Sequence, residues 1–247
     1  MASIASPRYS TASPLRIQAV ERSERGTRSG YFWCKRIIDV TLSTCLLVLF
    51  LPLMLLIAVL IKLDSSGPVL FTQKRIGVKR RTKGGRVLWV LHTFAFYKFR
   101  SMVANADQSC HQAYIKRFRE GRVTENKNST RFKLVNDSRV TRLGRILRKT
   151  SLDELPQLVN VLKGDMSLVG PRPALDYEGS LYDDYHFERF CAVPGITGLW
   201  QATARCQVPF EEMVRMDIQY VRQSSLWLDL KILALTLPAV VSGRGAG

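Results

Sequence analysis

The longest apolar stretch of the chain is an uncharged run at positions 40–61, VTLSTCLLVLFLPLMLLIAVLI. A straight helix of that length, at about 1.5 Å per residue, reaches across the roughly 30 Å hydrocarbon core of a bilayer. Pro52 lies in the middle of the run, where proline removes a backbone hydrogen bond and bends or breaks a helix. Basic residues flank both ends, and basic flanks favour the cytoplasm. Three structures remain open: a kinked crossing helix, a re-entrant hairpin that turns at Pro52, and a buried helix of a soluble protein.

The segment after this run has the pattern of short strands and then of helices. PVLFTQ (68–73) and RVLWVLHTFAFYKF (86–99) are rich in β-branched and aromatic residues, and a KGG turn lies between them. Such a pattern predicts a β-hairpin with a basic loop. Residues 103–130 are predicted to begin as a helix and continue as a loop, and RVTRLGRILRKTS (139–151) predicts a short basic helix.

The last third of the chain is predicted to be mainly helical. One helix with a single packed face is indicated by apolar residues at i, i+3, i+4 and i+7, which are Leu155, Leu158, Val159 and Leu162. It is expected to end at Gly164, and the proline-containing segment 167–175 is expected to be extended. Positions 211–241 predict a further helical region, in which Trp227 and an apolar end suit a membrane surface.

Charge and cysteine content narrow the classes of partner. The chain of 247 residues has 37 Lys and Arg against 20 Asp and Glu, a net charge of +17. Such a field attracts nucleic acid, nucleotides or an anionic membrane surface. The five cysteines are scattered without a C-x-x-C pair, which indicates neither a zinc site nor a disulfide framework and suits the cytoplasm. Positions 1–30 are rich in Ser, Arg and Gly and predict a disordered tail rather than a signal peptide.

Two adjacent carboxylates, Asp153 and Glu154, interrupt a strongly basic region in RKTSLDELPQL (148–158). One explanation is helix capping, because Ser151 and Glu154 have the S-x-x-E spacing of a capping box. Pro156 complicates that register, since with Ser151 as the N-cap it would be the fifth helical residue. With Asp153 as the N-cap, the proline would lie harmlessly in the first turn.

The other explanation is a site that handles phosphate. The pair is surrounded by basic residues: Arg139, Arg142, Arg145, Arg148, Lys149 and, later, Arg172. Carboxylates hold Mg²⁺, which bridges to substrate phosphates, and arginines bind phosphate oxygens in a fork geometry. An Asp or Glu can also form a covalent intermediate. A solvated basic face or contacts with lipid headgroups would give the arginines the same spacing, so spacing alone leaves both explanations open.

A set of motifs from about Lys35 to the C-terminus decides the family that the chain resembles. In chain order these motifs are KRIIDV, GPVLFTQKRIG, YKFRSM, LGRILRKTSLDELPQLVNVLKGDMSLVGPRP, VPGITGLWQ, DIQYV and SLWLDLKIL. With them the chain resembles the bacterial sugar transferases, also called monotopic phosphoglycosyl transferases. The long central motif is highly specific to that family.

The resemblance implies an enzyme that starts the synthesis of an exopolysaccharide or another glycoconjugate. It implies transfer of a sugar-1-phosphate from a nucleotide sugar, with UDP as the nucleotide, to polyprenyl (undecaprenyl) phosphate in two steps. By resemblance Asp153 is the nucleophile that forms a covalent phosphosugar. Glu154 completes the catalytic dyad, and both acids are candidate ligands of a Mg²⁺ cofactor.

The resemblance also assigns residues around the dyad. Arg148 and Arg172 match arginines that bind the substrate phosphates, and Lys98 and Arg100 are further candidates for phosphate binding. Pro52 matches the family's helix-breaking proline, which favours the re-entrant hairpin. The sequence departs from the family pattern at Ala204, where a glycine commonly precedes the next arginine, and this puts the role of that arginine in doubt.

Together these inferences predict an α+β, mainly helical, monotopic membrane protein. It has an N-terminal re-entrant helix-break-helix hairpin, a small β-hairpin element and surface amphipathic helices. The expected domains are a disordered basic tail at 1–30, a re-entrant membrane helix hairpin at 31–65 and a cytoplasmic catalytic domain with C-terminal interfacial helices at 66–247. The expected location is the cytoplasmic face of the bacterial inner membrane.

The expected partners are a nucleotide sugar, polyprenyl phosphate and membrane lipids, and a homo-oligomer is left open. A membrane-anchored nucleic-acid-binding protein is the rival in another class, and the high charge would suit it. The chain has no recognisable nucleic-acid motif, and its basic residues flank acids that a phosphodiester backbone would avoid. We therefore expect no nucleic-acid partner. A non-catalytic scaffold of the same family is the third hypothesis, and the intact dyad argues against it.

Overall fold

The structure is a computed structural model, and it describes residues 19–22, 29–83, 86–104, 137, 139–175, 178, 182–204 and 208–241. Nearly all of the segment predicted at 103–130 lies outside these residues, as do the arginine after Ala204 and most of the predicted tail.

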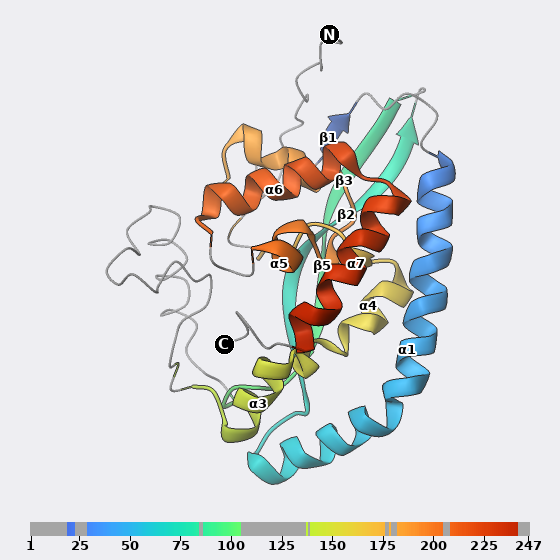
Figure 1. The fold of residues 1–247 in the computed structure, drawn as a ribbon. Helices are drawn as coiled ribbons and strands as arrows, with labels where there is room; N and C mark the ends of the chain where they lie inside the picture. The colour runs from blue at the N-terminus through green and yellow to red at the C-terminus, as the bar shows by residue number, and fades with distance from the viewer. Residues whose placement is uncertain are drawn as a thin grey trace.

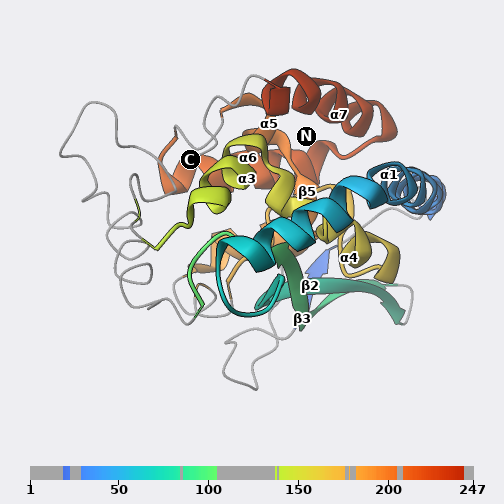
Figure 2. The same cartoon turned by 90° about the horizontal axis from the view of Figure 1, so that it is seen from below.

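Helix α1 (Ser29–Asp64) contains the whole apolar run and is the one helix of the described residues that is long and apolar enough to cross a membrane. It stays helical through Pro52 but bends partway along, so that it has two arms (Figure 1). Seen from below, the second arm lies across the underside of the domain (Figure 2). Many apolar side chains along α1 are exposed, for example Val48 at 70% and Leu63 at 78%. The predicted helix-break-helix is thus one bent helix, and its re-entrant placement in a bilayer stays a prediction.

A three-stranded antiparallel sheet follows α1. Strands β2 (Leu70–Lys83) and β3 (Arg86–Phe99) pair along their full length from Leu70↔Phe99 to Lys83↔Arg86, which confirms the predicted hairpin. Strand β1 (Ala19–Arg22) pairs with the other edge of β3. These four residues belong to the segment predicted as a disordered tail, and the structure instead places them in a strand that pairs with β3.

The remaining elements cover the hairpin and carry the polar residues of interest. In chain order they are α3 (Arg142–Thr150), the 3₁₀ turn η2 (Leu152–Glu154), α4 (Gln157–Lys163), β4 (Ser167–Val169), the 3₁₀ helix η4 (Asp184–Phe190), β5 (Gly195–Thr197), α5 (Leu199–Thr203), α6 (Phe210–Gln223) and α7 (Leu226–Val241). β4 and β5 form a short parallel pair. The basic helix, the helix that ends at Gly164 and the C-terminal helical region are all confirmed.

The buried face of α4 differs from the one that the apolar spacing predicts. Leu158 is buried as expected, but the other inward residues are Gln157, Asn160 and Val161. Leu155 lies in the turn before the helix and is only half-buried. Two polar side chains therefore face the core, where each needs hydrogen-bond partners.

The first arm of α1 is attached to the domain by charged side chains. Lys35 donates to Asp229 of α7 at 2.9 Å, and the backbone N–H of Leu168 donates to Asp39 at 3.0 Å. Arg36 donates to two carbonyls at the carboxyl end of α4. These contacts satisfy buried polar groups on both sides, so the arm is part of the folded domain rather than a separate anchor.

Candidate active site

The acidic pair lies in a tight turn between two helices. Ser151 ends α3 in the left-handed region at φ 58°, and its N–H donates to the Arg148 carbonyl. Asp153 and Glu154 then form the 3₁₀ turn η2, and α4 begins after Pro156. The Ser151 side chain makes no capping bond to η2, and neither does Pro156 to α4. Both capping registers considered from the sequence are therefore wrong, because α4 begins at Gln157 with Pro156 at its N-cap position rather than Ser151 or Asp153.

The two carboxylates lie beside the ammonium group of Lys98 on β3. Lys98 Nζ is 2.9 Å from Glu154 Oε1 and 3.9 Å from Asp153 Oδ2. Side-chain exposure is only 9% for Asp153, 21% for Glu154 and 17% for Lys98. Opposite charges at these distances attract strongly where water is largely excluded. The structure thus brings together three residues that the sequence analysis proposed for one site, although Lys98 lies more than 50 positions before the two acids.

Asn160 fixes the spacing between Lys98 and the acids. Its buried amide donates to the Ala95 carbonyl at 2.7 Å and accepts from the Tyr97 N–H at 3.1 Å. It therefore joins α4, which follows the acids directly, to the strand that carries Lys98. The sequence analysis missed this residue. Asn160 lies on the side of the predicted helix opposite to its apolar face, so the spacing of apolar residues gave no signal for it.

The predicted phosphate-binding arginines have different surroundings. Arg148 lies on α3, one turn before the acids, and its buried Nη1 has no hydrogen-bond partner. Arg100 is only 5% exposed, and its Nη2 donates to the Ile61 and Ser65 carbonyls at the end of α1. In this structure Arg100 therefore joins α1 to the domain, and a role in phosphate binding stays a prediction for it.

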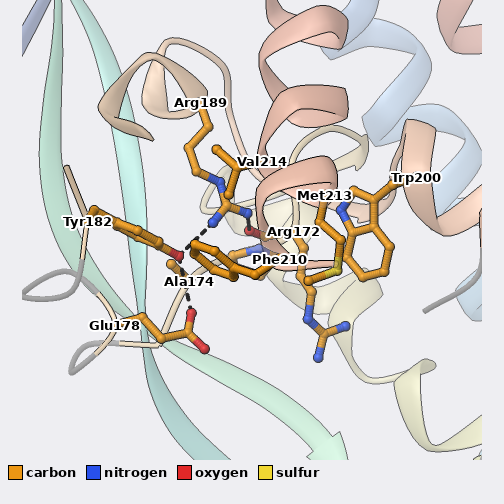
Figure 3. A pocket seen from close by; sticks show the side chains of 10 residues that line it. Arg172, Ala174, Glu178, Tyr182, Arg189, Trp200, Phe210, Met213 and Val214 are labelled. Carbon is orange, nitrogen blue, oxygen red and sulfur yellow. Dashed lines mark hydrogen bonds between the residues drawn. The ribbon is translucent and has the colours of Figure 1, made fainter. Parts of the chain in front are cut away.

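Arg172 belongs to a small pocket in the segment after β4 (Figure 3). Its cavity volume is about 20 Å³, enough for one water molecule. The polar and aromatic side chains that line it are Arg172, Glu178, Tyr182, Arg189, Trp200 and Phe210. The Arg172 side chain extends away from the hydrogen bonds that Tyr182 makes in this pocket (Figure 3).

Burial shifts the acidity of groups around this pocket. Burial raises the pKa of the Tyr182 phenol well above its usual value, so the hydroxyl stays protonated and donates to Glu178. Burial also raises the pKa of the Asp217 carboxyl on α6 to about 6, although the neighbouring Arg189 lowers it.

The sequence model of the family described as "Bacterial sugar transferase" matches residues 30–243. The chain belongs to the bacterial sugar transferase family. It is therefore a transferase, as the resemblance predicted. Among similar proteins is the galactosyl transferase CpsE of Streptococcus agalactiae serotype III, 41% identical over 213 residues that cover 86% of this chain and 43% of the relative.

Two further relatives are similar over more of their own length. The exopolysaccharide production protein ExoY of Rhizobium meliloti is 40% identical over 86% of this transferase and 87% of its own length. The UDP-glucose:undecaprenyl-phosphate glucose-1-phosphate transferase of Caulobacter vibrioides is 40% identical over 86% of the chain and 71% of its own length. The matched region of the transferase begins in α1 and includes every predicted site residue.

The acidic pair supplies the ligand chemistry that Mg²⁺ requires. Mg²⁺ commonly takes one or two protein carboxylates, several waters and substrate phosphate oxygens, so Asp153 and Glu154 fit the ion in that form. Within the described residues, no group of three or more His, Cys, Asp or Glu side chains is close enough to hold a metal alone. Asp153 and Glu154 could supply two of the oxygen ligands of a Mg²⁺ ion, with water or phosphate oxygens as the others.

Proposed function

We propose that this transferase moves a sugar-1-phosphate from a UDP-sugar to undecaprenyl phosphate, the initiating step of exopolysaccharide or glycoconjugate synthesis. The observation that carries the proposal is the buried Asp153–Glu154 pair beside Lys98. The name of the Caulobacter relative states a UDP-sugar donor, undecaprenyl phosphate and transfer of a sugar-1-phosphate. The names of the relatives differ in their sugars, galactose in one and glucose in another, so the proposal leaves the sugar to experiment.

In the first proposed step, a carboxylate oxygen of Asp153 attacks the phosphorus atom that bears the sugar. The new bond joins Asp153 to phosphorus, and the bond between that phosphorus and the bridging oxygen breaks, so that UMP leaves with the electron pair. Mg²⁺, when bound, neutralises charge on the diphosphate. Lys98 holds the carboxylates in place, and Arg148 and Arg172 bind phosphate oxygens.

In the second proposed step, a phosphate oxygen of undecaprenyl phosphate attacks the same phosphorus atom. The bond to Asp153 breaks, and the carboxylate is regenerated as the undecaprenyl diphosphate sugar forms. This order needs the acceptor phosphate at the turn η2, which suits an enzyme whose bent helix α1 enters the cytoplasmic face of the inner membrane and returns to it. The exposed apolar side chains of α1 and of α7 support that placement.

The test is release of UMP from a panel of UDP-glucose, UDP-galactose and UDP-N-acetylgalactosamine with the protein in nanodiscs, undecaprenyl phosphate and Mg²⁺. We expect UMP release with one donor. Without the acceptor, that donor should leave a phosphosugar adduct on the peptide that contains Asp153, visible by mass spectrometry. An adduct on Glu154 would exchange the roles of the two acids. An acceptor-dependent reaction that passes through no adduct would replace the two-step mechanism with direct transfer.

A further inference from the structure

A buried ion pair includes Arg189, one of the residues that line the pocket at Arg172. Arg189 of η4 donates through Nη2 to Asp217 of α6 at 2.5 Å, and the side chains are only 7% and 1% exposed. Arg189 also donates through Nη1 to the Tyr182 hydroxyl at 2.6 Å. The two charges are thus almost completely removed from water and enclosed in a network that joins η4 to α6.

The same guanidinium holds the backbone of the phosphate-binding segment. Arg189 Nη2 donates to the Arg172 carbonyl at 3.0 Å. The side chain of Arg172 extends away from Arg189 and Tyr182, so the contact fixes its main chain while its own guanidinium points elsewhere (Figure 3). Glu178 restrains the same segment further on, because it accepts a hydrogen bond from the Leu175 N–H at 2.9 Å.

We infer that Arg189 and Asp217 are positioning residues, which hold the Arg172 backbone so that its side chain meets the phosphates of the donor. The inference rests on the proposed function, since it assigns Arg172 to phosphate binding. Asp217 aims the Arg189 guanidinium, and Arg189 fixes the Arg172 carbonyl. Neither positioning residue needs to touch the substrate.

The cost of burying the pair supports a role beyond stability. Removing two charges from water is expensive, and apolar residues of similar volume often replace a buried ion pair with no loss of stability. An apolar pair could fill the space but could not donate a hydrogen bond to the Arg172 carbonyl. A displacement of about 1 Å in a substrate-positioning group can cost about 100-fold in rate.

The experiment replaces the pair by apolar residues, Arg189→Met with Asp217→Leu, in the full-length protein in nanodiscs. The readouts are kcat/KM with the donor panel and the Kd for UDP, measured by calorimetry with Mg²⁺ and without the acceptor. We expect the melting temperature to stay close to that of wild type, while kcat/KM falls by about 10- to 100-fold and UDP binds more weakly.

A double-mutant cycle separates positioning from a general structural role. If the pair acts through Arg172, the swap should add little further loss in an Arg172→Ala background. Equal losses in both backgrounds would mean that the pair acts by another route and would overturn the inference, as would an unchanged kcat/KM in the swap. If the swap does not fold, Asp217→Asn, which preserves shape and removes the charge, replaces it in the same cycle.

A neighbouring ion pair provides the matched control. Arg222 of α6 donates to Glu188 of η4 at 2.9 and 2.6 Å, so this pair joins the same two elements at a more exposed position. The change Arg222→Met with Glu188→Leu should leave kcat/KM and UDP binding unchanged. Normal kinetics in Arg172→Ala itself would exclude phosphate binding by Arg172 and would overturn this inference with it. A wild-type protein that is inactive on every donor would instead overturn the proposed function.

Discussion

Two acids share one buried cation at the centre of the site. Lys98 lies 2.9 Å from Glu154 and 3.9 Å from Asp153, and the three side chains are mostly enclosed. Of the two contacts with Lys98, that of Asp153 is the longer. A short ion pair with Lys98 would make the Asp153 carboxylate less available for the attack that we propose for it.

Asp153→Asn separates the catalytic role from a structural one. The change preserves shape and removes the charge and the nucleophile, so we expect turnover to fall by at least about 1000-fold with a small change in melting temperature. The measurement is UMP release in nanodiscs together with a thermal melt. Glu154→Gln is the companion variant, and we expect it to lose activity while still forming some adduct. Substantial turnover by Asp153→Asn would exclude Asp153 as the nucleophile.

Arg172 provides a second prediction at the scale of single residues. We expect Arg172→Ala to raise KM for the donor and lower kcat/KM by about 10- to 100-fold, because a charge-assisted contact with phosphate is lost. Arg172→Lys should recover activity only in part, since an ammonium is a point charge and cannot replace a planar fork. Arg215, an exposed arginine on α6 that pairs with Glu212, is the control, and Arg215→Ala should behave as wild type. Full recovery by lysine would argue against fork geometry.

The sequence revealed residues whose chemistry is local and missed those whose partners are distant. Asp153, Glu154 and Lys98 belong to recognisable motifs. Asn160 acts on a strand 65 positions earlier, and Arg189 acts on an acid 28 positions later. Nothing in the spacing of a single chain marks such pairs before the fold brings them together.

Helix α3 rests directly on the chain that follows β3. The Thr141 N–H donates to the Ser101 carbonyl, and a Cβ on Gly144 would lie only 2.0 Å from that oxygen. Glycine is therefore required at this position for close approach of two backbones. The contact places α3, and with it Arg148, against the chain just after the strand that carries Lys98.

Gly144→Ala tests this contact at the scale of the element. The added methyl group must push α3 away from Ser101, and we expect a loss of about 1 to 3 kcal/mol in stability with a fall in turnover. Thermal melts and UMP release measure the two effects. Gly30→Ala on α1 is the matched control, because a Cβ there meets no atom within 4 Å. A Gly144→Ala protein as stable and active as the control would show that α3 adapts easily.

The elements with a strong pattern were predictable, and their exact orientation was not. The hairpin and the helices after it follow from the spacing of apolar residues along the chain and from the residues typical of turns. The buried face of α4 was predicted incorrectly, because the helix turns Asn160 inward to bond the edge of β3. A tertiary hydrogen bond here outweighs the apolar spacing that the sequence displays.

At the scale of the whole molecule, the bend in α1 bears on the membrane topology that we propose. Pro52 is the residue in the helix that cannot donate a backbone hydrogen bond, and such a residue bends a helix sharply. In the proposed topology both arms return to the cytoplasmic face, and the domain stays on one side.

Pro52→Ala should straighten α1 and place part of the population in a crossing orientation. The measurement is labelling of a single cysteine placed before Lys35, in a background without native cysteines, by a reagent that does not cross the membrane. We expect the wild-type protein to be protected from the periplasm and Pro52→Ala to be partly labelled. Pro238→Ala, at the proline inside α7, is the matched control and should stay protected. Periplasmic labelling of the wild type would establish a crossing helix.

The contacts of Lys35, Arg36 and Asp39 have a consequence for how the protein is made. Their partners lie between 125 and 194 positions later in the chain. At about 5 to 20 residues per second, the ribosome delivers the last of these partners some 10 to 40 s after it has added Lys35. During that interval these three charged side chains, which lie beside an apolar run, lack the hydrogen-bond partners that the folded domain gives them. We expect a nascent chain of this protein to depend on a membrane or a chaperone until its final helix emerges.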